Sequence, residues 1–294
     1  MKIKHKRRLA AFLCLLMLGT MTACGSKDKE TTKLADGLEI TTDGDKTIVT
    51  FVDAFGEVHG MTINSKAEMM DYDKSAFVKD GEKMTYTDSA NYTYRLGVDV
   101  SEHQGAIDWT QVKAAGYDFA IIRAVYRGYT EGTLNQDATY QSNIEGALAA
   151  GLEVGVYVFS QAVNETEAEE EAQLAIDSVR NYNITGPIVY DPESILNDES
   201  RTDDVTGEQF TKNTVAFCEK VKAAGYTPMV YSNMMWEAYK FDLTKLSDYD
   251  FWYADYEDAP QTPYNFKYWQ YSESGSVPGI EGSADLNIQM IAAE

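Results

Sequence analysis

Two carboxylates separated by a single residue follow an apolar run in the middle of the chain. The run Ile188-Val189-Tyr190 leads directly into Asp191-Pro192-Glu193. In an extended backbone, residues i and i+2 point to the same side with Cα atoms ~7 Å apart, so we expect Asp191 and Glu193 to project together. Two neighbouring carboxylates cannot ionise equally easily, so the pKa of one of them rises. A carboxylic acid that stays protonated near neutral pH can donate a proton to a glycosidic oxygen, and the longer Glu193 is the better candidate.

Further acids fall at the ends of predicted strands. Asp99 lies at the end of an apolar run at 96–100, Asp255 follows a run at 251–254, and Asp285 precedes one at 286–290. A buried strand normally excludes Asp, because a charge there needs a partner or water. Each acid alone has an equally good structural explanation, such as a turn or a cap. Their convergence on one edge would favour a catalytic site, and Glu193 with Asp191 would supply the two acids that glycoside hydrolysis uses.

Other side chains near the strand ends are candidates for binding a sugar. Aromatic rings offer flat apolar faces for stacking, although we expect most of the 20 Tyr and four Trp residues to lie in the core. The predicted substrate-binding residues are Arg123, Tyr157, Phe159, Tyr231, Asp255 and Trp269.

The composition excludes several classes of function. The formal net charge of -22 argues against a nucleic-acid partner, since phosphate binding needs clustered Lys and Arg. Only His5, His59 and His103 occur, and His5 lies in a segment that we expect to be removed, so a three-His zinc site is impossible. Ser-His-Asp chemistry would have to use His59 or His103, and no nucleophile-elbow motif accompanies either. We therefore predict no metal and no cofactor.

The first residues resemble a bacterial lipoprotein signal. Five basic residues precede the apolar run 9–18, which is followed by Thr22-Ala23-Cys24-Gly25-Ser26. This ending is similar to a lipobox, in which the Cys is acylated and becomes the mature N-terminus; an ordinary secretory signal is the alternative. We expect residues 1–23 to be removed and lipidated Cys24 to anchor a secreted protein to the outer face of the bacterial cell membrane. Cys218 would then be the one unmodified cysteine, which leaves no internal disulfide.

Composition divides the mature chain into three parts. Residues 24–37 are polar and read as a linker. Residues 38–92 form a small β-rich module, with expected strands at 38–42, 47–53 and 58–63 around Gly-containing turns. Residues 64–92 are hard to assign, and a spacer, a lid and a wall-binding unit are all open roles for the module.

Residues 93–294 alternate between apolar strands and amphipathic helices, so the acids would be positioned by a parallel α/β arrangement. Eight strands suit a closed but irregular barrel, whose active site lies at the C-terminal ends of the strands. The expected strands are 96–100, 119–124, 154–159, 188–191, 229–232, 251–254, 266–270 and 286–290, and the expected helices are 108–115, 135–150, 166–179, 207–224 and 233–239.

Several runs in this region closely resemble family 25 glycoside hydrolases, the Chalaropsis-type lysozymes or N-acetylmuramidases. The matching runs begin with Leu96-Gly-Val-Asp-Val-Ser-Glu-His-Gln-Gly, and continue with Gly155-Val-Tyr-Val-Phe159, Asp191-Pro-Glu193, Tyr231-Ser-Asn233, Trp252-Tyr-Ala-Asp-Tyr256, Trp269-Gln-Tyr-Ser272 and Ser283-Ala-Asp-Leu-Asn287. The order of the runs is the order of the family, and residues 38–92 are outside the resemblance. Val158 stands where many members have His, and Pro192 stands where the family is more permissive.

The resemblance implies a (β/α)5β3 barrel preceded here by the β-rich module. It implies cleavage of the β-1,4 bond between N-acetylmuramic acid and N-acetylglucosamine in peptidoglycan, with Glu193 as general acid/base, Asp191 as its partner, and Asp99 and Asp285 as further aspartates of the site. The expected partners are glycan strands and, through Cys24, a membrane; we expect a monomer. A non-catalytic peptidoglycan-binding lipoprotein and a glycosidase for chitin-like chains are the alternatives, and the stereochemical outcome is left open.

Overall fold

A computed structural model describes residues 29–33, 39–43, 46–196 and 198–293. The predicted signal segment 1–23, the lipidation site Cys24 and most of the predicted linker lie outside the described residues. None of the helices in the described ranges has the length and apolarity that a membrane span requires.

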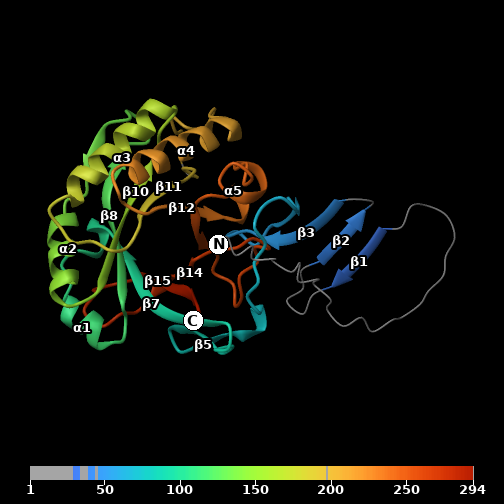
Figure 1. Cartoon of the computed structure of the whole chain (residues 1–294), viewed down its shortest axis with the longest axis horizontal. Coiled ribbons are helices and arrows are strands. Elements are labelled where there is room, and N and C mark those ends of the chain that lie inside the picture. Colours follow the sequence, from blue (N-terminus) through green and yellow to red (C-terminus); the bar gives the residue numbers. More distant parts are fainter. Residues whose placement is uncertain (1–28, 34–38, 44–45, 197, 294) are drawn as a thin grey trace, which may run out of the picture.

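Eight strands close into a barrel, as the sequence predicts (Figure 1). Seven of them run parallel, and the last one lies antiparallel between its two neighbours, β14 and β7. The barrel strands are β7 (Tyr92–Val100), β8 (Phe119–Arg127), β10 (Glu153–Ser160), β11 (Ile188–Pro192), β12 (Pro228–Asn233), β13 (Asp250–Ala254), β14 (Tyr268–Gly275) and β15 (Ala284–Ala292).

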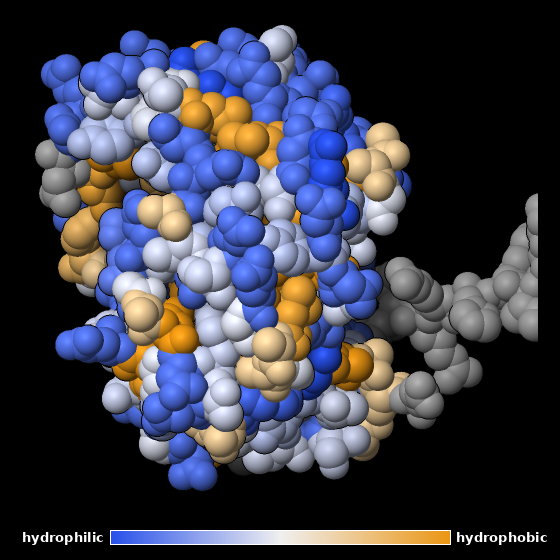
Figure 2. Space-filling model, turned by 90° about the vertical axis from the view of Figure 1, so that its left-hand side faces the viewer, coloured by the Kyte–Doolittle hydropathy of each residue, from blue (hydrophilic) through white to orange (hydrophobic). Residues whose placement is uncertain are grey.

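A helix follows each of the first five barrel strands, which gives the predicted (β/α)5β3 order. The helices are α1 (Trp109–Ala114), α2 (Tyr140–Ala149), α3 (Glu165–Val179), α4 (Gly207–Ala223) and α5 (Met234–Tyr239). Side chains of Asp108, Asn164, Thr206 and Asn233 cap four of them by accepting backbone N–H groups. Helices α1–α4 cover one side of the barrel (Figure 1), and that side of the surface is mainly hydrophilic (Figure 2).

The predicted start of the second helix is wrong. Residues 135 and 136 belong to a short strand, β9 (Leu134–Gln136), which pairs antiparallel with the end of β8. The Asp137 side chain then accepts the N–H of Thr139 at 2.9 Å and makes a turn, so α2 begins at Tyr140. Pairing with β8 holds residues 134–136 in an extended backbone, so the helix cannot begin there.

Alternating strand residues build two apolar layers. The layer inside the barrel consists of Phe119, Ile121, Val189, Met229, Tyr231, Trp252, Ala254 and Tyr268. The other layer lies between the strands and their outer covering. Gly97 shows how tightly the interior is filled, because a Cβ atom there would lie 2.3 Å from the ring of Phe119.

The residues before the barrel form two small antiparallel sheets. Four strands make the first sheet: β1 (Lys29–Lys33), β2 (Glu39–Asp43), β3 (Lys46–Val52) and β4 (Val58–Thr62). Strand β1 lies inside the predicted linker, so regular structure begins earlier than expected because β1 pairs along β2. A 3-10 helix, η1 (Lys74–Ala76), precedes the hairpin of β5 (Phe77–Asp80) and β6 (Lys83–Tyr86) in the segment that the sequence left unassigned.

This N-terminal module packs against the side of the barrel formed by β13, β14 and β15. In the described part of the chain, none of these three strands is followed by a helix. Tyr72 donates its hydroxyl to the carbonyl of Phe266 at 2.5 Å, and the Phe77 ring lies 5.1 Å from the Trp269 ring. Buried residues of the module and of the barrel belong to one continuous cluster. The module therefore completes the outer layer of the barrel.

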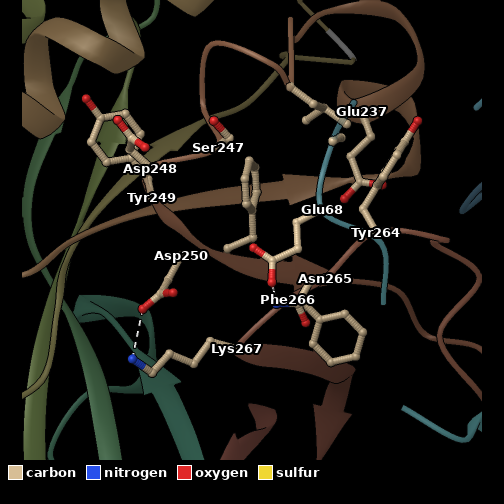
Figure 3. Close-up of a pocket in the computed structure, with 13 residues that line it drawn as sticks. Glu68, Glu237, Ser247, Asp248, Tyr249, Asp250, Tyr264, Asn265, Phe266 and Lys267 are labelled. Atoms are coloured by element: carbon tan, nitrogen blue, oxygen red, sulfur yellow. Dashed lines mark hydrogen bonds and ion pairs between the residues drawn. The ribbon is translucent and has the colours of Figure 1, made fainter. Parts of the chain in front are cut away.

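A cavity of about 110 Å³ marks part of this junction (Figure 3). Glu68 of the module reaches it beside Asn265, while Lys267 pairs with Asp250 at 2.8 Å on the barrel side. The cavity lies at the N-terminal ends of β13 and β14, the end of a parallel barrel that is used for stability rather than chemistry.

Candidate active site

Asp191 and Glu193 lie at the C-terminal end of β11. Asp191 is two residues after Val189, which is part of the interior layer, so its side chain also faces the inside of the barrel. Asp191 is 4% exposed, whereas Glu193 follows the strand and is half-buried. The structure thus places one acid in the barrel interior and the other at its mouth.

The carboxyl group of Asp191 is buried without a complete set of partners. Its Oδ1 atom has no hydrogen-bond partner among the described residues. Burial raises the pKa of Asp191 well above its ordinary value, and the charges of Glu193 and Asp99 raise it further; Arg123 opposes them. Asp191 therefore favours the protonated state.

Asp99 and Asp285 face each other across β7 and β15, where they are direct partners in the antiparallel register. Asp99 Oδ2 accepts hydrogen bonds from Gln270 Nε2 at 2.9 Å and Asn287 Nδ2 at 2.7 Å. Burial raises the pKa of Asp99 to about 6, and burial together with the charge of Asp99 raises the pKa of Asp285 to about 9. The two amide donors stabilise a charge on Asp99, so the shared proton resides on Asp285.

Glu193 has the pKa of an acid/base group. Burial and the charge of Asp99 raise its pKa to about 7, and a side-chain hydrogen bond with Tyr231 lowers it. Its backbone is fixed, because Gln161 Nε2 donates to the Glu193 carbonyl at 2.8 Å and the Gln161 amide oxygen accepts the hydroxyls of Ser200 and Thr202. A carboxyl group held in this way can give up and regain a proton near neutral pH.

A cavity of about 640 Å³ opens over Glu193 and has the size of a small-molecule site, ~300–1,000 Å³. Tyr231, Asp255 and Tyr256 line its barrel side. Its other side is lined by residues 52–56 of the N-terminal module, which the sequence did not place near the site.

Two predicted aromatic residues, Tyr157 and Tyr231, point into the barrel interior, and Tyr231 also lines this cavity. The rings of Tyr157 and Tyr231 meet Trp252 edge-on, with centroids 6.0 and 4.9 Å apart. Phe159 is half-buried two residues after Tyr157 on the same face of β10. Asp255 uses its carboxylate inside its own loop, where it accepts Tyr253 Oη at 2.7 Å and the Gln261 N–H at 2.8 Å.

The prediction that Trp269 binds substrate is wrong. Trp269 is fully buried on the outer face of β14 and donates its indole N–H to the Asp255 carbonyl at 2.7 Å. Its neighbour Gln270 points inward to Asp99 instead. The sequence Trp269-Gln270-Tyr271 alternates aromatic and polar residues, but here the aromatic face meets the module and the polar face meets the site.

Arg123 lies in the middle of β8 rather than at its end, because β8 continues to Arg127. Its guanidinium donates to Asp137 Oδ2 at 2.8 Å and Glu102 Oε1 at 3.0 Å. These two carboxylates balance its charge, and Arg123 supplies a positive field to Asp191.

Sequence reasoning missed the amides that hold the acids. Asn287 bridges the interior, since it donates to Asp99 and accepts the indole N–H of Trp252 at 2.8 Å. Gln270 accepts the hydroxyls of Tyr231 and Tyr256 at 3.1 and 3.0 Å. A register prediction for β14 and β15 would have placed Gln270 and Asn287 opposite each other.

One cluster in the described ranges has the spacing of a metal site. Asp53, Glu57 and His59 bring potential ligand atoms within 4.8 Å of one another. Asp53 Oδ1, however, accepts the N–H groups of Phe55 and Glu57 at 2.9 Å each, and Oδ2 pairs with His59 at 2.8 Å. The carboxylate is therefore engaged in forming the β3–β4 turn.

Comparisons with known proteins agree with this geometry. Residues 98–280 match the glycosyl hydrolases family 25. The chain is 30% identical over 193 residues to an autolytic lysozyme of Clostridium acetobutylicum, a match that covers 65% of this chain. It spans only 54%, about half, of that relative's length.

Two solved structures extend the comparison. A family 25 glycosyl hydrolase from Bacillus anthracis is 26% identical with a TM-score of 0.55, over 66% of this chain and 88% of that one. The modular autolysin LytC of Streptococcus pneumoniae has a TM-score of 0.60 at 24% identity, over 89% of this chain and 67% of that one. The likeness of fold to LytC thus extends beyond the barrel into the preceding residues.

Proposed function

Since this chain belongs to glycosyl hydrolase family 25, we propose that it is a lysozyme that cleaves the β-1,4 bond between N-acetylmuramic acid and N-acetylglucosamine in peptidoglycan. The observation that carries the proposal is Glu193, whose pKa of about 7 lies close to neutral pH in a cavity large enough for sugars. Around it lie the carboxyl groups of Asp99, Asp191 and Asp285, whose pKa values are raised to different extents.

The geometry divides the work between the acids. Protonated Glu193 donates its proton to the glycosidic oxygen while the bond from that oxygen to the anomeric carbon breaks. Ionised Asp99, fixed by Gln270 and Asn287, stabilises the positive charge that develops on the sugar ring. The Glu193 carboxylate then accepts a proton from the incoming water and returns to its starting state.

Glu193→Gln is the direct test on purified peptidoglycan. The amide keeps the shape of the side chain but has no proton to donate, so we expect kcat to fall by about 10³-fold. The release of new reducing ends measures turnover, and thermal unfolding checks that the fold is intact.

Mass spectrometry of the parent enzyme's products identifies the bond. A muramidase leaves muramic acid at the new reducing end, whereas a glycosidase for chitin-like chains leaves N-acetylglucosamine. Unchanged turnover in Glu193→Gln would overturn the assignment of the acid, and the second product would overturn the assignment of the substrate.

We also propose that the protein is a lipoprotein on the outer face of the cell membrane and acts there as a monomer on glycan strands. The support is the lipobox-like run that ends at Cys24, after the basic and apolar segments of a signal peptide. Cys24→Ser should abolish the incorporation of labelled fatty acid and move the protein from the membrane fraction to the medium. Labelled Cys24→Ser would contradict the proposal, and light scattering of the detergent-solubilised protein checks the monomer.

A further inference from the structure

The turn between β3 and β4 lines the same cavity as Glu193. Residues 52–56 form one wall, and Phe55 within that wall leaves 70% of its surface exposed. The turn lies outside the match to family 25, which begins at residue 98. The N-terminal module therefore adds a wall that the barrel itself does not supply.

Exposed apolar side chains gather at this cavity. Nine large hydrophobic residues are exposed in the described ranges, and five of them line it: Phe55, Leu196, Met235, Tyr239 and Tyr256. Single exposed apolar residues are ordinary, but a cluster of them around a cleft marks a binding surface. Because this cluster is continuous with the catalytic Glu193, its occupant is a part of the same substrate.

The turn is held in place before any ligand arrives. Asp53 accepts the N–H groups of Phe55 and Glu57, and Gly56 takes the positive φ of 80° that the turn requires. Gln261 ties the end of β3 to the barrel, since it exchanges hydrogen bonds of 2.7 and 2.9 Å with Val52 and donates to Asp255. A preorganised wall loses little entropy on binding.

The charge of the lining favours a sugar over a peptide. Among the described residues, the acids that line the cavity are Asp53, Glu193, Asp255, Glu257 and Glu273, and the one cation that lines it is Lys240. A stem peptide with free carboxylates would be repelled by this set, whereas the apolar face of a sugar ring packs on an aromatic ring without carrying charge.

We propose that the β3–β4 turn forms an additional saccharide subsite, in which Phe55 stacks on a sugar unit beyond the two that flank the cleaved bond. This inference rests on the proposed lysozyme activity. It assigns to the N-terminal module a direct part in binding the glycan chain.

The test compares two peptide-free glycan fragments as substrates of Phe55→Ala: an octasaccharide, and the disaccharide that fills only the two positions at the cleaved bond. Longer chains gain from the extra subsite, so the ratio of kcat/KM for the long fragment to that for the short one should fall by about fivefold to tenfold. Phe55→Trp should retain the ratio of the parent enzyme. Val58→Ala is the matched control, because Val58 is equally exposed at 70% on the same hairpin but does not line the cavity.

An unchanged length ratio in Phe55→Ala would overturn the subsite. A loss that appears only on intact, peptide-bearing peptidoglycan would overturn the choice of a sugar and assign the turn to the stem peptide. Failure of the lysozyme proposal is a separate result, because the parent enzyme would then cleave neither fragment. Phe55 is too exposed for the substitution to alter the fold, and the temperature of unfolding verifies this.

Discussion

Two of the buried acids, Glu171 and Asp191, differ in their partners. At the back of β8, Glu171 of α3 is fully buried, but Oε1 accepts Arg127 Nε at 2.7 Å and Oε2 accepts Ser160 Oγ at 2.6 Å. Inside the barrel, below Glu193, Asp191 is 4% exposed and its Oδ1 has no partner in the described part of the chain. Both carboxylate oxygens of Glu171 accept hydrogen bonds, whereas one oxygen of Asp191 accepts none.

The surroundings of the two acids act on their pKa values in opposite senses. Burial raises the pKa of Glu171 to about 7, and the hydrogen bonds of Ser160 and Arg127 oppose the shift. Burial of Asp191 is reinforced by the charges of Glu193 and Asp99. A buried acid with a full partner set stabilises the fold, whereas a buried acid whose neighbours raise its free energy is characteristic of a reaction site.

The largest effect on stability should come from breaking the structural pair. Arg127→Met leaves the Glu171 carboxylate buried without its cation, so we expect a loss of about 3–5 kcal/mol in the free energy of unfolding, measured by urea titration. Arg180→Met is the matched control: Arg180 forms an exposed pair with Asp177, so the loss should be below ~1 kcal/mol. Equal losses in the two variants would show that the burial of an ion pair does not determine how much its cation contributes to stability.

Substitution of Asp191 inside the barrel should change the free energy of unfolding in the opposite direction. Asp191→Asn removes a group that resists ionisation, so stability at pH 7 should rise by about 0.5–2 kcal/mol while activity falls. The pKa of Asp191 is higher in the folded than in the unfolded state, so the parent loses stability as pH rises above the unfolded value of ~3.9. The gain should therefore be absent below that pH, and destabilisation at pH 7 would contradict the comparison.

The pH dependence of kcat/KM should reflect the titration of Asp99 and Glu193 and not that of Glu171. Activity requires ionised Asp99 and protonated Glu193, so the profile should rise near pH 6 and fall near pH 7 as a coupled group titrates. Glu171→Gln should leave both limbs in place, although the pKa of Glu171 is also about 7. A shift of either limb in that variant would show that the titration of Glu171 affects the active site.

The smallest effect should come from Tyr231. The Tyr231 hydroxyl donates to Gln270 at 3.1 Å and can turn instead to the Glu193 carboxylate, where it lowers the pKa of Glu193. Tyr231→Phe should therefore move the alkaline limb of the profile to higher pH. In this variant the Tyr256 hydroxyl still donates to the amide oxygen of Gln270 at 3.0 Å and keeps that side chain in place. A limb that moves to lower pH would show that the hydroxyl stabilises the protonated form of Glu193.

The barrel could be predicted because its signals are local. Apolar runs, caps such as Asp108 and the acids after each run follow directly from the order of residues. The inward or outward orientation of β14 could not be predicted, because Trp269 and Gln270 are both buried and only the register of neighbouring strands distinguishes their faces. The position of Phe55 depends on contacts with residues such as Gln261, which lies 209 positions after Val52 and leaves no local pattern.

That separation along the chain has a consequence for how the protein is made. Val52 and Tyr72 find their partners 209 and 194 residues later, so the N-terminal strands leave the ribosome about 10–40 seconds before the surface that covers them exists. Such distant contacts also slow folding after synthesis ends. The final strand β15 must enter between β14 and β7 before the barrel is closed. The barrel therefore cannot close until the end of the chain has been made, which is compatible with the export that we propose.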